Sequence, residues 1–280
     1  MVEVAANPWV GPVLALSPSS IEDWQRCRRL YRTRHLLNVP SSEPNRLATG
    51  VGLEVHRLLE LVHAEGCCGD LAAMSALVHR EMDSPGCGAA GRADRGEEPV
   101  SGLTPGGPGG RIDADLVEGY LTRHATRCPG AGSSWSGHEL TLARYHRRPP
   151  RWVLTGRIDA VWARGAFLEG RDYKTGRRRF DRVVEDLAGR LQVWLLAPLA
   201  AEQGLRLRLS YEHLSLESPG DPDRYEPEDE DLVAIEDEVC ALAVEINAEI
   251  GFPGCGQAGT CRRCTYESIC AERIADPAPL

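Results

Sequence analysis

The order of predicted helices and strands indicates an α+β fold, with a mixed sheet flanked by helices. Segments of alternating apolar residues at Glu139–His146, Trp152–Trp162 and Ala166–Tyr173 are typical of a three-stranded antiparallel meander. A long helical pattern at Val183–Glu202 and a further strand at Leu205–Leu216 follow them. We therefore expect a core of strands and one long helix, preceded by a helical region and followed by a cysteine-rich segment.

The N-terminal third of the chain has helical patterns. Ser19 or Ser20 is the expected N-cap of a helix at Ile21–Leu36. Residues 83–110 are rich in Gly and Pro and have no periodicity, so we expect a flexible insertion there, and a loop at Ser133–Gly137. Further helices are expected at Thr49–Glu65, Leu71–Met82, Ile112–His124 and Glu228–Ile250.

These segments predict one domain with short appendages. Residues 1–16 are expected to be an N-terminal extension, residues 17–270 a single domain and residues 271–280 a tail. The parts of the domain are a helical part at 17–132, a core at 139–216, an acidic linker and helix at 217–250, and the cysteine-rich segment at 251–270.

The composition excludes several classes of protein. A chain of 280 residues that is 42% hydrophobic can bury a sizeable core, which excludes a disordered chain or a fibre. The longest apolar stretch, Val193–Ala201, is too short to span a bilayer, and the N-terminus lacks a basic region like that of a signal peptide. We therefore expect no membrane association and a cytoplasmic location.

The net charge of −9 is unevenly distributed. Residues 217–238 carry eleven Asp and Glu against one Arg, so the rest of the chain is close to neutral. Arginines cluster outside this segment, for example at Arg144–Arg151. The overall sign argues against non-specific binding of nucleic acid, but these clusters permit a groove that binds phosphates.

Three polar residues fall where two adjacent strands should be buried. Asp172 and Lys174 are two residues apart on a strand, so both side chains point to the same face, and Asp159 lies on the preceding strand. Two carboxylates bind a hard cation such as Mg²⁺ or Mn²⁺, which stabilises a pentacovalent phosphate and lowers the pKa of a water molecule. A lysine can orient that water. The pattern predicts metal-dependent phosphodiester chemistry, although the Asp-x-Lys triplet alone is common.

The wider pattern resembles the PD-(D/E)XK nuclease superfamily, and within it the RecB/AddB-type exonuclease branch. Gly156-Arg157-Ile158-Asp159, followed by Asp172-Tyr173-Lys174-Thr175-Gly176, is similar to the G-x-I-D and D-Y-K-T-G motifs of that branch. The segment from Gly52 to His56 is similar to its helical G-x-x-x-H motif. The segment from Gln192 to Leu196 is similar to its Q-x-x-x-Y motif, with Leu196 in place of the tyrosine.

The resemblance implies a PD-(D/E)XK core and a role for each matching residue. Lys174 would position the attacking water, and Gln192 would be a further site residue. Glu139 is either another acid of the site or an ordinary carboxylate at the end of a strand. The metal ligands that the resemblance implies are His56, Asp159, Asp172 and the carbonyl of Tyr173.

A second metal-binding pattern lies near the C-terminus. Cys261-x2-Cys264-x5-Cys270 is a tight array, and in a reducing compartment clustered cysteines are metal ligands rather than disulfides. The array resembles that of RecB-like exonucleases with an iron–sulfur staple, including CRISPR-associated exonucleases, which have one further cysteine before the nuclease core. Cys27 occupies that place, with Cys255 as a competing fourth ligand.

The resemblance implies a 4Fe-4S cluster on Cys27, Cys261, Cys264 and Cys270, with Zn²⁺ as the alternative, because both metals accept four thiolates. Such a cluster would tie together the two ends of the domain. The remaining cysteines are interpreted as unliganded: Cys67, Cys68, Cys87, Cys128 and Cys240.

These observations predict a Mg²⁺- or Mn²⁺-dependent DNA nuclease. We expect an exonuclease that acts on single-stranded DNA or DNA ends, in repair, recombination or defence, and no small-molecule substrate. The chain has no Walker A motif, so any helicase partner would be a separate subunit. The alternative is a catalytically silent DNA-binding or scaffold subunit, which the presence of Asp159, Asp172 and Lys174 disfavours.

Overall fold

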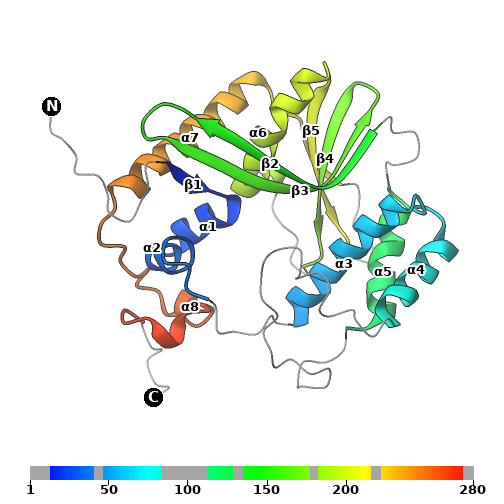
Figure 1. Cartoon of the computed structure of the whole chain (residues 1–280), viewed down its shortest axis with the longest axis horizontal. Coiled ribbons are helices and arrows are strands. Elements are labelled where there is room, and N and C mark those ends of the chain that lie inside the picture. Colours follow the sequence, from blue (N-terminus) through cyan, green and yellow to red (C-terminus); the bar gives the residue numbers. More distant parts are fainter. Residues whose placement is uncertain are drawn as a thin grey trace.

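The computed structural model describes residues 13–40, 47–83, 112–128, 135–176, 182–215 and 222–273. A mixed sheet lies between two groups of helices, which confirms the predicted α+β fold (Figure 1). The strands are β1 (Leu14–Leu16), β2 (Trp135–His146), β3 (Trp152–Arg164), β4 (Phe167–Lys174), β5 (Arg206–His213) and β6 (Asp223–Tyr225). The helices of three turns or more are α3 (Leu47–Ala64), α4 (Leu71–Asp83), α5 (Ala114–Ala125), α6 (Leu187–Glu202) and α7 (Asp229–Ala248).

The meander forms as its alternating pattern predicts. β2 pairs antiparallel with β3, and β3 pairs antiparallel with β4. Helix α6 then returns the chain so that β5 lies parallel to β4. β2 begins at Trp135, so part of the segment predicted as a loop at Ser133–Gly137 is strand instead.

Two short strands at the sheet margins were not predicted. β1 pairs parallel with Trp152–Leu154, so the segment expected to be an N-terminal extension contributes a strand to the sheet. β6 pairs antiparallel with β5 and lies within the segment expected to be an acidic linker. Each strand has three residues, so its local pattern carries little signal and the pairing partner determines it.

One edge of β3 is shared by two partners. β1 pairs with Trp152–Leu154, while β4 pairs with Ala160–Arg164. Residues Thr155–Asp159 lie between these two ladders. They have β2 on one side and no strand of the described chain on the other, and we call this segment the β3 gap.

The first helix is shorter than predicted. α1 (Pro18–Arg26) ends where Cys27 takes an extended conformation with φ of −166°, and α2 (Arg28–Tyr31) and a π-helical turn at Arg32–Leu36 follow. The single helix predicted at Ile21–Leu36 is therefore wrong. The N-cap is Ser17, neither Ser19 nor Ser20, because Pro18 suits the first helical position and Ser20 completes a capping box with Ser17.

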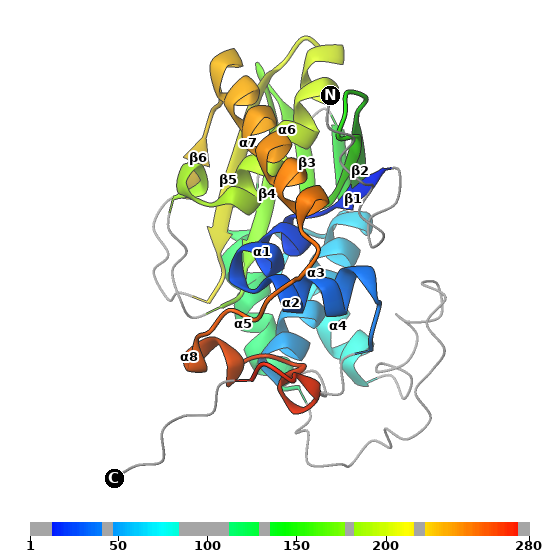
Figure 2. The same ribbon diagram turned by 90° about the vertical axis from the view of Figure 1, so that its left-hand side faces the viewer.

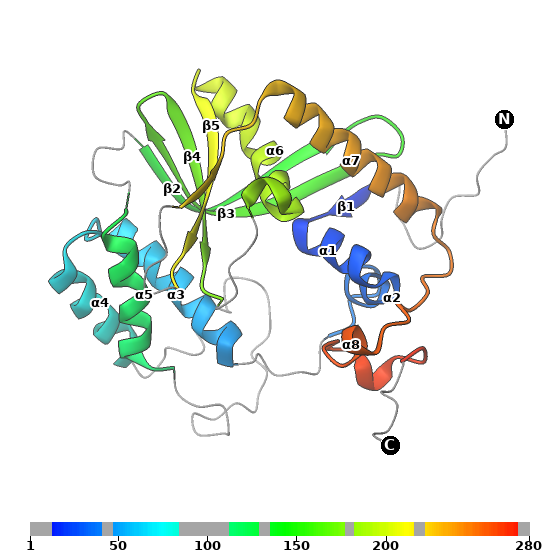
Figure 3. The ribbon, with the colours of Figure 1, turned by 180° about the vertical axis from the view of Figure 1, so that it is seen from behind.

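The two faces of the sheet have separate cores. On one face α1, α6 and α7 pack around buried residues such as Trp152, Trp194 and Ile235. On the other face α3, α4 and α5 pack around Val55, Leu58 and Trp162. Figure 3, from behind, shows α3, α4 and α5 together on one side of the molecule and α7 on the other.

The C-terminal segment lies against the N-terminal helices (Figure 2). α8 (Ala258–Cys261) follows the long helix α7. The Tyr266 hydroxyl donates to the carbonyl of Val39 at 2.7 Å, and Arg28 pairs with Glu249 at 2.6 Å. These contacts bring the two ends of the predicted domain side by side.

The insertion expected at 83–110 lies outside the described residues beyond Asp83, the last residue of α4. The predicted helix at Val183–Glu202 is a 3-10 turn at Val183–Glu185 followed by α6, which Asp186 caps. No helix in the described ranges is both long and apolar enough to cross a membrane.

Candidate active site

Asp159 and Asp172 lie where two strands separate. The ladder between β3 and β4 ends at Ala160 and Arg171, one residue short of the two aspartates. The backbone N–H of Tyr173 donates to Asp159 Oδ2 at 2.7 Å in place of a ladder hydrogen bond. The ladder therefore ends beside the two carboxylates, and the β3 gap lies next to them.

Lys174 and Gln192 both contact Asp172. Lys174 Nζ donates to Asp172 Oδ2 at 2.9 Å, and Gln192 Nε2 on α6 donates to the same oxygen at 3.1 Å. The ammonium of Lys174 also lies 4.2 Å from the ring centroid of Tyr211, a cation–π contact. Asp172 and Lys174 thus share one face of β4, as their spacing predicts.

His56 reaches the same place from α3. Its Nδ1 lies 3.3 Å from Asp159 Oδ1, and its Nε2 lies 3.0 Å from the carbonyl oxygen of Tyr173. One turn earlier, a Cβ on Gly52 would lie 2.9 Å from Thr175 Oγ1. The glycine of the G-x-x-x-H pattern therefore lets α3 approach the end of β4 closely enough for His56 to reach the carboxylates.

Glu139 on β2 belongs to this group. Ligand atoms of His56, Glu139 and Asp159 all lie within 4.8 Å of one another, and Arg157 Nε lies 2.6 Å from Glu139 Oε2. Glu139 has φ of +50°, a conformation that non-glycine residues rarely adopt and that is often found at functional sites. The sequence left open whether Glu139 is a site acid; its unusual backbone, invisible in the sequence, favours that reading.

Burial and crowding of like charges shift the pKa values of the group. Burial raises the pKa of Asp172, and the charge of Asp159 raises it further despite Lys174. Burial likewise raises the pKa of Glu139. Burial lowers the pKa of His56, but the hydrogen bond and charge of Asp159 outweigh this effect, and the net shift is upward. Crowded carboxylates of this kind are relieved by a cation.

The donor set fits a hard divalent cation. It consists of carboxylate and carbonyl oxygens with one imidazole. The Oε1 atom of Gln192 is buried, and the described part of the chain gives it no hydrogen-bond partner. Carboxylates, the Gln192 amide and a lysine therefore converge on one place.

The composition of the chain gives evidence about Lys174 that is independent of the motifs. Among the 32 Lys and Arg residues of the chain it is the only lysine. Every other fixed cation is a guanidinium, which is planar, larger and permanently charged, whereas an ammonium is compact and can change protonation state. The presence of the single lysine at this position favours a chemical role for it.

The structure also places the cysteines of the C-terminal pattern. They line a cavity of about 140 Å³ beside α2 and α8, together with both candidates for the fourth ligand. These residues are Cys27, Cys255, Cys261, Cys264 and Cys270. We call this the terminal cysteine cavity; it is built from segments at opposite ends of the domain.

A family model for the PD-(D/E)XK nuclease superfamily matches residues 15–271, nearly the whole chain. The chain belongs to the PD-(D/E)XK nuclease superfamily. No curated protein matches the sequence. The match begins at Ala15 in β1, which agrees with the inclusion of that strand in the nuclease sheet.

Two solved structures are similar to this nuclease over most of their length. One is a “Putative exonuclease” from Eubacterium rectale, with 11% identity and a TM-score of 0.51, over 95% of this chain and 91% of that one. The other is a protein called SSO0001, with 12% identity and a TM-score of 0.38, over 93% of this chain and 87% of that one. At 11% identity the first similarity supports the fold alone.

The structure brings the predicted residues together in two places. Around the β3 gap it gathers His56, Asp159, Asp172, Tyr173, Lys174 and Gln192. Sequence reasoning did not identify Tyr211, whose register position opposite Asp172 becomes apparent only once β5 pairs with β4. Leu196, at the place of the family tyrosine, is buried in the core beneath Gly170 and does not contribute a ring to the site.

Proposed function

We propose that this nuclease is a Mg²⁺- or Mn²⁺-dependent DNA exonuclease of the RecB/AddB type, acting on single-stranded DNA or DNA ends. The observation that carries the proposal is the convergence of His56, Asp159 and Asp172 with Lys174 where β3 and β4 separate. Nothing in the packing of the sheet requires two carboxylates, a histidine and a lysine at this position. The exonuclease name of the Eubacterium rectale protein agrees with this assignment.

The residues divide into those that hold the cation and those that act on the water. Asp159, Asp172 and His56, with the Tyr173 carbonyl, would hold the cation, and Glu139 is a further candidate ligand. When bound, a divalent cation supplies positive charge against the phosphate as it becomes pentacovalent and makes a nearby water more acidic.

Lys174 and Gln192 prepare the nucleophile. The Lys174 ammonium, fixed by Asp172 and the Tyr211 ring, is placed to orient a water and to offset the negative charge that develops on the phosphate. Gln192 holds Asp172 in place with its amide N–H. A fixed ammonium and a fixed carboxylate constrain the attack geometry.

A cleavage assay tests the activity. Single- and double-stranded DNA labelled at either the 5′ or the 3′ end is incubated with the protein and Mn²⁺ or Mg²⁺. We expect metal-dependent release of short products from ends, with Asp172→Ala inactive and Asp237→Ala, an exposed acid on α7, fully active. Cleavage of closed circular single strands at the same rate would reject the exonuclease part, and an inactive wild type would favour the catalytically silent DNA-binding or scaffold subunit.

A second part of the proposal concerns the terminal cysteine cavity. We propose that it holds a 4Fe-4S cluster that fastens the C-terminal segment to the break between α1 and α2. The break itself supports this proposal, because the extended backbone at Cys27 turns this residue into the cavity. The cavity is lined by more thiols than a cluster needs, so Cys27 and Cys255 compete for the fourth position.

Iron content and melting temperature of matched variants test the staple. Cys27→Ser should lose iron and lower the melting temperature by roughly 10 °C, because closing a loop of more than two hundred residues is worth several kcal/mol. Cys255→Ser should change both much less, and Cys240→Ser, distant from the cavity, should change neither. Full iron content and an unchanged melting temperature in Cys27→Ser would assign the fourth ligand position to Cys255. A colourless protein that contains zinc would show that the cavity binds Zn²⁺ and not the cluster.

The pathway follows from the same proposal. This sequence contains no Walker A motif, and a helicase that exposes DNA ends is the partner we expect in repair, recombination or defence. Co-purification of a helicase with the tagged nuclease, lost when the protein is denatured, would test this partnership.

A further inference from the structure

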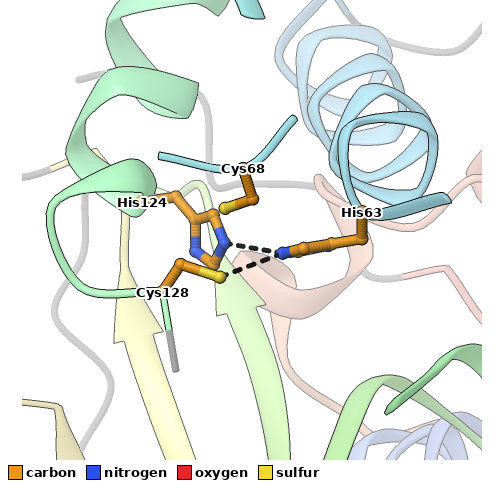
Figure 4. A group of neighbouring side chains, drawn as sticks. All are labelled: His63, Cys68, His124 and Cys128. Atoms are coloured by element: carbon orange, nitrogen blue, oxygen red, sulfur yellow. Dashed lines mark hydrogen bonds between the residues drawn. The ribbon is translucent and has the colours of Figure 1, made fainter. Parts of the chain in front are cut away.

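A second group of metal-binding side chains lies on the helical side of the sheet, apart from both sites above. It contains two histidines and two cysteines, His63, Cys68, His124 and Cys128 (Figure 4). His63 is in the last turn of α3 and His124 in the last turn of α5, and each helix is followed by one of the cysteines. The four side chains point toward one another from two helix ends that are distant in the sequence.

The distances fit a single ion. The four candidate ligand atoms all lie within 4.8 Å of one another. His63 Nε2 lies 2.9 Å from His124 Nε2 and 3.4 Å from Cys128 Sγ. With Zn–N bonds of about 2.1 Å and Zn–S bonds of about 2.3 Å, the edges of a tetrahedral site span about 3.3–3.8 Å. Small movements of the side chains are sufficient to form it.

The surroundings of the group resemble those of a structural metal site. His124 is fully buried, and its Nδ1 lies 3.0 Å from Oε1 of the buried Glu212 on β5. A carboxylate on the second ring nitrogen fixes the tautomer that leaves Nε2 free to bind a metal. The ring of His138 stacks on His63 at 4.4 Å between centroids and fixes its orientation.

We propose that these two histidines and two cysteines bind one structural Zn²⁺ ion. Two thiolates and two imidazoles in a tetrahedron suit Zn²⁺, whereas Mg²⁺ and Mn²⁺ prefer oxygen ligands. Four protein ligands leave no open position for a substrate, so the ion is structural rather than catalytic. The earlier interpretation of Cys68 and Cys128 as unliganded is revised by this proposal, which does not depend on the nuclease activity.

The ion would fasten the helical layer to the sheet. Its ligands come from α3, the turn before α4, α5 and the turn after α5. Glu212 extends the connection, because it also accepts from Arg171 on β4 at 2.8 Å. The layer has a smaller core than the opposite face of the sheet, so a metal ion that joins the ends of α3 and α5 would add substantially to its stability.

Metal analysis of purified variants tests the proposal. The background is Cys261→Ser/Cys264→Ser, which disables the terminal cysteine cavity, so that any zinc remaining is not held there. We expect about one zinc per chain in this background, and loss of most of it on adding Cys68→Ser or Cys128→Ser. Cys67→Ser is the matched control: this neighbouring thiol contacts the Val62 carbonyl and should leave the zinc content unchanged.

A measurement on the unmodified ligands covers the case in which the variants do not fold. Zinc X-ray absorption of the unsubstituted protein should show a first shell of both nitrogen and sulfur, and Co²⁺ in its place should give the visible bands of a tetrahedral thiolate site. Zinc that survives Cys68→Ser, a shell of oxygen only, or a Cys68–Cys128 disulfide with no metal in freshly purified protein would each overturn the proposal.

Discussion

Helix α3 carries two histidines that lie among different kinds of metal-binding side chain. His56 lies among carboxylates at the β3 gap, while His63, two turns later, lies between a second histidine and two cysteines. The first histidine has carboxylate oxygens as its neighbouring donors, whereas the second group contains a fully buried histidine and two thiols. The comparison shows that the neighbouring donors, not the histidine, determine whether a site suits a hard catalytic cation or a closed structural ion.

The carboxylates provide the strongest test of this difference. Asp159→Ala and Asp172→Ala should each lower cleavage by roughly 10³-fold or more, because the cation contributes several kcal/mol to the transition state. Zinc content should be unchanged, since neither aspartate is near His63. Cleavage rates with Mn²⁺ and zinc analysis of the same preparations measure both. Near-wild-type cleavage would remove these carboxylates from the proposed site.

Substitutions of Lys174 test whether the site needs an ammonium group or only a positive charge. Lys174→Ala should lower cleavage by about 10²–10³-fold, and Lys174→Arg should not restore it, because a planar guanidinium cannot replace the compact ammonium beside Asp172. Calorimetry should show little change in Mn²⁺ affinity, since a cation does not ligate a cation. A loss of affinity equal to that of Asp172→Ala would indicate a structural role.

Gln192 should have a smaller effect. Gln192→Ala removes the amide that holds Asp172 at 3.1 Å, and a residue that orients a metal ligand typically contributes about 10–100-fold to activity. Gln192→Glu, which keeps the length but loses the N–H, should resemble the alanine variant. Full activity of Gln192→Glu would show that the acceptor oxygen, and not the N–H, is what matters.

The smallest expected effect concerns stability without added divalent cation. Burial and Asp159 raise the pKa of Asp172, so the stability that its protonated form contributes is lost as the pH rises through that raised pKa. Asp172→Asn should therefore melt slightly higher than wild type at neutral pH, and the difference should vanish in acid. Loss of a zinc ligand should instead lower the melting temperature. Melting curves of Asp172→Asn and Cys68→Ser, recorded without chelator, therefore contrast the two groups.

Much of the core was predictable because its signals are local. Alternation located β2, β3 and β4, and the two-residue spacing put Asp172 and Lys174 on one face. The three-residue strands β1 and β6 have no such signal, because only their partners make them strands. The break at Cys27 was also missed, since the residues on both sides of it favour helix and the extended conformation depends on packing against the C-terminal segment.

The group of His63, Cys68, His124 and Cys128 could not be found from the sequence, for a different reason. His63 and Cys68 lie close together in the chain, as do His124 and Cys128, but more than fifty residues separate the two pairs. Only the packing of α3 against α5 makes them neighbours. The terminal array was easier to find because three of its cysteines fall within ten residues.

The β3 gap itself offers little edge for self-association. An unpaired strand edge is normally a template for addition of another strand, and proteins commonly cover or interrupt such edges. Here the edge is only five residues long, is enclosed by β1 and β4, and its Arg157 carbonyl already accepts from Gln192 Nε2 at 3.3 Å. This short edge thus leaves backbone beside the carboxylates without a partner among the described strands, yet offers a neighbouring molecule too few residues to extend the sheet there.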